Sequence, residues 1–233
     1  MCIRKSKIPY LRDVYLAYLI QGARQTKKNG YPIIEDWMVA KEPPKEMIQW
    51  DRRYDIIEPH ETTICFYCND SGFQSIFARP HKYVEKLKKY QSVVGLDASP
   101  YDNMPLVIQN SQIYINLATT YFYGINGIKI IPNVRLGDNR TYDSLDAYPK
   151  NSLISIGTNG FTHRLENRFV FAEQVQKIVD VLEPSGICVY GPVLDDIFAY
   201  VRLKDIPIYQ YDSYSMKQNK KDKNLSEEKE NEG

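Results

Sequence analysis

Two aspartates that follow a short apolar segment carry side chains suited to acid–base or metal chemistry. Asp97 ends the segment 92–97, SVVGLD, and Asp102 comes shortly after it. Paired carboxylates bind Mg²⁺ or transfer protons, because proximity pushes their pKa values apart. The alternative for Asp102 is to cap the helix that the next residues predict. Asp97 and Asp102 are therefore candidate catalytic residues, with Mg²⁺ as the candidate cofactor.

A second polar group follows the apolar segment 127–134, GIKIIPNV, within the longer stretch GIKIIPNVRLGDNRTYD. Arginine binds phosphate and carboxylate groups through parallel hydrogen bonds, so Arg135 and Arg140 are candidate anion ligands. We predict catalytic roles for Arg135 and Asp138, and ligand binding for Asn133 and Arg140. The alternative is that Arg135 and Asp138 form a salt bridge with each other.

The turn GTNG, residues 157–160, precedes the clearest helical pattern in the chain. A glycine-containing turn before a helix presents backbone N–H groups to an anion, although this one matches neither common phosphate-binding motif. A tight turn in which glycine supplies a positive φ is the alternative. The predicted ligand-binding residues are Ser99, Asn133, Arg140, Gly157, Thr158, Asn159, Gly160 and Tyr190.

The stretch CFYC, Cys65 to Cys68, is a lone CxxC. A zinc site needs a second such pair, and a redox dithiol normally begins a helix, so buried packing is the favoured interpretation. The sequence has no GxSxG, HExxH, Walker, kinase or Rossmann motif, which lowers support for the common hydrolases, kinases and dehydrogenases.

The composition is that of a globular protein without an overall electrostatic preference for nucleic acid. The 233 residues are 43% hydrophobic and carry a formal net charge of +1. The 19 tyrosines suit half-buried strand surfaces or base stacking. Residues 1–28 hold seven Lys or Arg against Asp13. This basic arm is either a nucleic-acid contact or, more simply, a solvated helix face.

The elements that must position these residues alternate from residue 62 onward. Short apolar runs bounded by turn residues predict strands at 62–68, 92–97, 127–134, 151–157, 186–191 and 206–212. Apolar residues at helical spacing predict helices at 8–28, 80–90, 104–123, 164–184 and 195–204.

This alternation predicts an α/β fold, with βαβ units and a mostly parallel sheet of about six strands. The pattern leaves two architectures open, a doubly wound sheet and an incomplete barrel. In both, ligands bind beyond the carboxyl ends of the strands. Because polar residues follow each predicted strand and ordinary turn residues precede it, we expect a site at this edge.

Three regions are expected: an N-terminal helix and wrapping excursion over 1–60, an α/β domain over 61–216, and a charged tail over 217–233. The tail has almost no apolar residue, which predicts disorder. No segment approaches the roughly 20 apolar residues of a transmembrane helix, and the start lacks the apolar run of a signal peptide. We therefore expect a cytoplasmic protein without membrane contact.

The region from about Pro80 to Asp212 resembles the domain of unknown function 4417 family, which occurs on prophages and other bacterial mobile elements. The resemblance is carried by YxxMP after an aspartate and a serine, by IPNVRxGD, and by the glycine turn. Leu136 stands where the family often has tryptophan, and Gly157 where its turn has serine. The matching positions are Asp97, Ser99, Met104, Pro105, Asn133, Arg135, Gly137, Asp138, Thr158 and Gly160.

Two functional classes remain in competition. The first is a protein, and in its strongest form an enzyme, that binds or processes a phosphate-bearing or nucleotide-like ligand at the carboxyl edge of the sheet. The second is a nucleic-acid-binding or host-interaction accessory protein without catalysis. The resemblance implies a mobile-element context and brings no reaction with it.

Overall fold

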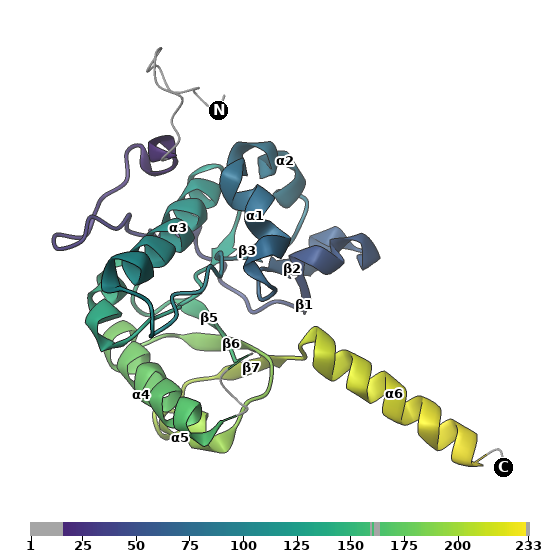
Figure 1. The fold of residues 1–233 in the computed structure, drawn as a ribbon. Helices are drawn as coiled ribbons and strands as arrows, with labels where there is room; N and C mark the ends of the chain where they lie inside the picture. The colour runs from purple at the N-terminus through teal and green to yellow at the C-terminus, as the bar shows by residue number, and fades with distance from the viewer. Residues whose placement is uncertain (1–15, 159, 161–163, 232–233) are drawn as a thin grey trace.

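The computed structural model describes residues 16–158, 160 and 164–231, and its strands form two parallel sheets (Figure 1). The first sheet has the order β1 (Glu46–Gln49), β2 (Thr62–Cys65), β3 (Ser92–Val94), β4 (Ile130–Ile131). The second has the order β5 (Leu153–Gly157), β6 (Gly186–Tyr190), β7 (Ile208–Tyr211). An isolated parallel bridge between Asn133 and Ser155 connects the end of β4 to β5.

The α/β class with parallel strands is confirmed, but the prediction of one sheet of about six strands was wrong. The described strands divide into sheets of four and three, and their pairings close no barrel. Within both sheets the strand order follows the sequence, without the reversal that defines a doubly wound sheet. The split arises because β4 is only two residues long and continues as a single bridge.

The central strands are buried on both faces, as expected for parallel strands covered by helices. Every residue of β2, β3, β5 and β6 is buried. In Figure 1 the helices that follow these strands form an arc on their outer side. They are α1 (Asp70–Ala78), α2 (Val84–Leu87), α3 (Leu106–Ile125), α4 (Leu165–Leu182) and α5 (Asp195–Leu203).

The segment 29–60, predicted as an irregular excursion, contains β1 and three short 3-10 helices. These are η2 (Asp36–Met38), η3 (Trp50–Asp55) and η4 (Pro59–Glu61). β1 was missed because prolines and charges surround its one fully buried residue, Met47. Two further 3-10 helices lie between the main elements, η5 (Pro80–Lys82) and η6 (Asn139–Ala147).

Only part of the predicted N-terminal helix over 8–28 falls within the described residues. There it is limited to the 3-10 helix η1 (Ala17–Ile20), and turns follow. Gly22 adopts a φ of 81°, a left-handed conformation that ends a helix. Residues 21–28, the last part of the helix predicted over 8–28, are therefore not helical.

The C-terminal segment forms the helix α6 (Tyr214–Asn231), where the composition predicted a disordered tail. Lys and Glu, which supply eight of its 18 residues, are good helix formers even without an apolar face. Ion pairs join its first turns to β1, from Lys217 to Glu46 (3.2 Å), and to the residue after β7, from Lys220 to Asp212 (2.5 Å). No helix in the described residues is long and apolar enough to span a membrane.

Candidate functional site

A cavity of about 680 Å³ lies where the carboxyl ends of the strands meet. Parallel strands bring their carboxyl ends to one edge, so residues far apart in the sequence become neighbours there. The lining comes from the segments after β1, β2, β3, β4, β5 and β7, and from α4. It consists of Gln49, Asp51, Arg52, Tyr67, Cys68, Asn69, Asp97, Ser99, Pro100, Tyr101, Asp102, Arg135, Leu136, Gly137, Gly157, Gly160, Asn167, Val170, Gln174, Tyr214 and Ser215.

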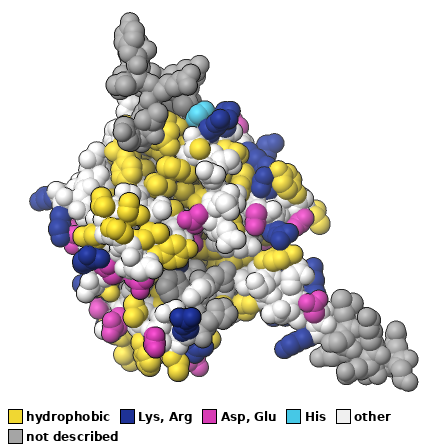
Figure 2. Space-filling view, in the orientation of Figure 1, with side chains coloured by type: hydrophobic (Ala, Val, Ile, Leu, Met, Phe, Trp, Pro, Cys, Tyr) yellow, Lys and Arg dark blue, Asp and Glu magenta, His cyan; other side chains and the backbone are white. Residues whose placement is uncertain are grey.

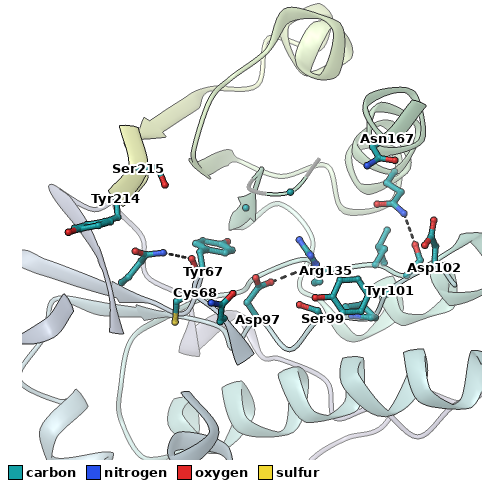
Figure 3. Close-up of a pocket in the computed structure, with 18 of the residues that line it drawn as sticks. Tyr67, Cys68, Asp97, Ser99, Tyr101, Asp102, Arg135, Asn167, Tyr214 and Ser215 are labelled. Carbon is teal, nitrogen blue, oxygen red and sulfur yellow. Dashed lines mark hydrogen bonds and ion pairs between the residues drawn. The ribbon is translucent and has the colours of Figure 1, made fainter. Parts of the chain in front are cut away.

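Asp97 and Arg135 form an ion pair at this cavity (Figure 3), with 3.9 Å between Asp97 Oδ1 and Arg135 Nε. Their side chains are only 11% and 15% exposed. Burial raises the pKa of Asp97, while the Arg135 charge and a hydrogen bond from Asn133 oppose that rise. The cavity therefore contains a carboxyl group with a raised pKa next to a guanidinium.

Asn133 lies behind this pair and fixes the position of Asp97. Its Nδ2 donates to Asp97 Oδ1 at 2.8 Å and to the carbonyl oxygen of Leu96 at 3.0 Å. Its Oδ1 accepts a hydrogen bond from the Tyr67 hydroxyl at 3.0 Å. Two acceptors on one side and a donor on the other leave the amide a single favourable orientation. Asn133, predicted to bind ligand, supports Asp97 and is not among the residues that line the cavity.

Tyr67 forms part of the cavity lining and connects the two sheets. Its ring stacks on Tyr190, with 5.2 Å between centroids and 17° between planes, and its hydroxyl lies 2.8 Å from Ser155 Oγ. A Cβ added to Gly157 would lie 2.5 Å from the Tyr67 ring. Gly157 therefore leaves room for Tyr67, while Tyr190 packs behind it rather than lining the cavity.

The remaining residues of the glycine turn lie in different places. Gly160 lines the cavity, with a φ of 90°. Thr158 is buried, and its hydroxyl donates to the Tyr190 carbonyl oxygen at 3.3 Å. Asn159 lies outside the described residues. Gly157 and Gly160 of the turn therefore line the cavity without side chains, and the Thr158 hydroxyl makes a buried hydrogen bond.

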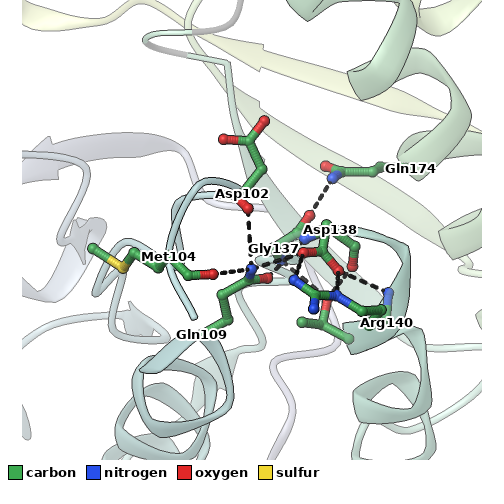
Figure 4. A network of polar contacts seen from close by, with 8 residues as sticks. Asp102, Met104, Gln109, Gly137, Asp138, Arg140 and Gln174 are labelled. Atoms are coloured by element: carbon green, nitrogen blue, oxygen red, sulfur yellow. Dashed lines mark hydrogen bonds and ion pairs between the residues drawn. The ribbon is translucent and has the colours of Figure 1, made fainter. Parts of the chain in front are cut away.

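Asp138 and Arg140 do not line the cavity, but their network reaches the lining residue Asp102 through Gln109, whose Nε2 donates to the Asp102 carbonyl oxygen at 3.2 Å (Figure 4). Arg140 donates from Nε to Asp138 Oδ1 at 2.9 Å and from Nη2 to Oδ2 at 2.5 Å. Gln109 Nε2 also donates to Asp138 Oδ2, at 2.8 Å. Hydrogen bonds from Arg140 and Gln109 hold the pKa of Asp138 well below its usual range. The alternative pair of Arg135 with Asp138 is not the one formed, since each has another partner.

Ser99 and Asp102 both line the cavity, but in different surroundings. Ser99 is buried, and its hydroxyl donates to Asp70 Oδ1 at 3.2 Å. Asp102 is exposed, and Figure 3 shows it on the far side of Arg135 from Asp97. The two aspartates predicted as a pair therefore do not face one another.

Neither a metal site nor a reactive thiol is found among the described residues. No group of three or more His, Cys, Asp or Glu there is placed to hold a metal ion, so the magnesium hypothesis gains no support. Cys68 lines the cavity, and burial raises the pKa of its thiol to about 12. The thiol is therefore protonated near neutral pH and is a poor nucleophile.

Several lining residues were not predicted from the sequence, above all Asp51 and Arg52 in η3 and Tyr214 at the start of α6. Arg52 lies over the Tyr214 ring, with its Cζ 4.0 Å from the centroid. These residues follow β1 and β7. Recognition of β1 as a strand was the missing signal, because it would have placed Arg52 at the same edge as Asp97.

Comparison with known proteins gives one curated relative. The Gene 1 protein of Mycobacterium phage L5 is 21% identical over 151 residues, which are 64% of this chain and 66% of the phage protein. The match thus spans slightly less than two thirds of that relative. No solved structure matches the chain. The model of the family described as Domain of unknown function (DUF4417) matches residues 28–212, and the chain therefore belongs to this family.

Proposed function

We propose that the cavity binds a nucleotide-like, phosphate-bearing ligand. The observation that carries this proposal is the mostly buried Asp97–Arg135 pair in a cavity of about 680 Å³ at the carboxyl ends of the strands. Burying two charges is costly, and sites of ligand binding and catalysis are where such pairs and shifted pKa values concentrate.

The charges of the lining favour a ligand that presents both an anion and hydrogen-bond donors. Arg52 and Arg135 supply guanidinium groups for phosphate oxygens. Asp51, Asp97 and Asp102 supply carboxylates, which repel a bare phosphate but accept from amino and hydroxyl groups. A nucleotide carries phosphate, sugar hydroxyls and base donors in one molecule, and so satisfies both sets.

The aromatic lining suits the base of such a ligand. Tyr101 is 56% exposed at the cavity, and Tyr214 presents a ring beside Arg52. Stacking on tyrosine is favourable for every base, because each base has a π face. In an enzymatic form of this function Asp97 is the proton acceptor, since its raised pKa brings proton transfer closer to neutral pH.

Thermal-shift and calorimetric binding measurements test the proposal. Nucleoside monophosphates are expected to raise the melting temperature by mass action, and to do so more than the matching nucleosides or inorganic phosphate. Arg52→Ala and Arg135→Lys are each expected to weaken nucleotide binding about tenfold, equal to about 1.4 kcal/mol.

Arg202→Ala is the matched control, because Arg202 pairs with the exposed Asp195 on α5 at 2.8 Å and is not a lining residue. The Arg202→Ala variant is expected to bind nucleotides with the affinity of the unmodified protein. If no nucleotide shifts the melting temperature, or if both cavity variants bind as the control does, the proposal is wrong.

A further inference from the structure

The 3-10 helix η3 carries two consecutive arginines that contact different rings. Arg52 lines the cavity and lies over Tyr214. Arg53 lies over both Trp50 and Tyr54, with its Cζ 4.1 Å and 4.2 Å from the two ring centroids. Its Nη2 also donates to the Tyr54 hydroxyl at 2.7 Å. η3 therefore connects the cavity to a cation–aromatic cluster outside it.

Lys86 of α2 completes this cluster. Its Nζ lies 5.2 Å from the Trp50 centroid and 5.3 Å from the Tyr54 centroid. Trp50 is buried, whereas Tyr54 is 78% exposed. Tyr54 is therefore a largely exposed ring that two cations contact, and such cation–π contacts are favourable.

The segment around α2 extends the positive charge. Between residues 79 and 89 Glu85 is the only acid, against Arg79, Lys82, Lys86, Lys88 and Lys89. Figure 2 shows Lys and Arg side chains gathered over α2 and beside it, at the upper right. We call Arg53, Tyr54, Lys86 and the basic residues of 79–89 the η3–α2 surface.

Resting on the proposed function of the cavity, we infer that a single-stranded nucleic acid lies along the η3–α2 surface and places one nucleotide in the cavity. Proteins that bind single strands combine exposed aromatic rings, on which bases stack, with cations that contact the phosphates. Tyr54 supplies the ring, and Arg53 and Lys86 supply the cations. Arg52 precedes Arg53 in η3 and lines the cavity, so it connects this surface with the cavity.

The local acids limit the electrostatic part of this binding. Asp51 and Asp55 lie in η3 itself, so its two arginines add no net charge, and the excess positive charge comes from residues 79–89. Few phosphates are therefore neutralised. The affinity is expected to fall with salt, but with a shallower slope than that of proteins that contact many phosphates.

Fluorescence anisotropy with the whole chain tests the inference. The probes are single-stranded DNA oligonucleotides of increasing length, a duplex of the same sequence, polyglutamate, and a labelled mononucleotide. Longer single strands are expected to bind more tightly than the mononucleotide, and more tightly than the duplex or polyglutamate. Tyr54→Ala is expected to weaken oligonucleotide binding about tenfold and to leave mononucleotide binding unchanged.

Lys86→Ala is expected to weaken oligonucleotide binding and to reduce its salt dependence. Lys204→Ala is the matched control, because Lys204, the residue after α5, lies over the Tyr200 ring at 5.3 Å. Equal affinity for oligonucleotides and mononucleotide, or unchanged oligonucleotide binding in Tyr54→Ala and Lys86→Ala, overturns the inference and leaves the proposed function standing. Tighter binding of duplex or polyglutamate overturns it as well. If the unmodified protein binds oligonucleotides but not the labelled mononucleotide, the proposed function of the cavity is wrong.

Discussion

Arg135 pairs with Asp97 across two strand ends, and not with Asp138, its near neighbour in the sequence. The Arg135 Nε and Asp97 Oδ1 atoms are 3.9 Å apart, and both side chains are mostly buried. Asp138 is occupied by Arg140 and Gln109. One charged pair thus lines the cavity, while the other stabilises the turn that follows β4.

Arg135→Met is expected to lower the free energy of unfolding by about 3 kcal/mol, because it leaves the Asp97 carboxylate buried without the neighbouring positive charge. The double variant Arg135→Met with Asp97→Asn is expected to lose clearly less free energy of unfolding than Arg135→Met alone, since neither residue then leaves a buried charge. Urea unfolding of the two single variants and the double variant measures the coupling. Additive losses would contradict an interaction between these residues.

Asp97→Asn is expected to gain stability relative to the unmodified protein as pH rises. Burial raises the pKa of folded Asp97 above its unfolded value of about 3.9, so the folded state binds the proton more tightly. Between these two pKa values the unmodified protein loses stability with increasing pH, and the Asn variant lacks that loss. Unfolding free energies of both proteins at a series of pH values from about 4 upward test this. If the Asn variant instead loses stability relative to the unmodified protein as pH rises, the effects of Arg135 and Asn133 on the pKa of Asp97 outweigh the effect of burial.

Asp138→Ala is expected to cost about 1–2 kcal/mol at neutral pH, because Asp138 caps η6 and accepts from the Arg140 backbone N–H at 2.9 Å. The folded pKa of Asp138 is lowered, so its contribution is present above the unfolded pKa and is lost as pH falls through the folded one. Thermal unfolding at neutral and acid pH measures the change. Asp195→Ala, at a 94% exposed side chain, is the control and is expected to cost under about 0.5 kcal/mol.

Gly157→Ala is expected to destabilise the protein by about 2 kcal/mol, since its Cβ would meet the Tyr67 ring at 2.5 Å and displace it from Tyr190. The altered tyrosine packing is expected to change the near-ultraviolet circular dichroism. Gly72→Ala in α1 is the control, because its Cβ would meet only the Cys68 side chain, at 3.3 Å. Equal stability of the two variants would show that Tyr67 moves at little cost.

Patterns confined to neighbouring residues predicted many of the elements. The apolar spacing of 104–123, 164–184 and 195–204 anticipated α3, α4 and α5, and short apolar runs anticipated β2, β5, β6 and β7. The helix α1 was missed, because Gly72 weakens its helical pattern. The split into two sheets was also missed, since pairing between distant strands leaves no local signal.

For the cavity, the sequence by itself determined that polar residues follow the strands, and that parallel strands bring such residues to one edge. Asp97, Ser99, Asp102, Arg135, Gly157 and Gly160 do line one cavity there. Only the tertiary structure decided that Arg135 pairs with Asp97, that Asn133 and Tyr190 stand behind the lining, and that Arg52 and Tyr214 join it. The physical reason is that hydrogen bonds and ion pairs depend on distances of a few ångströms between separate segments, whereas sequence patterns record only which residues are adjacent along the chain.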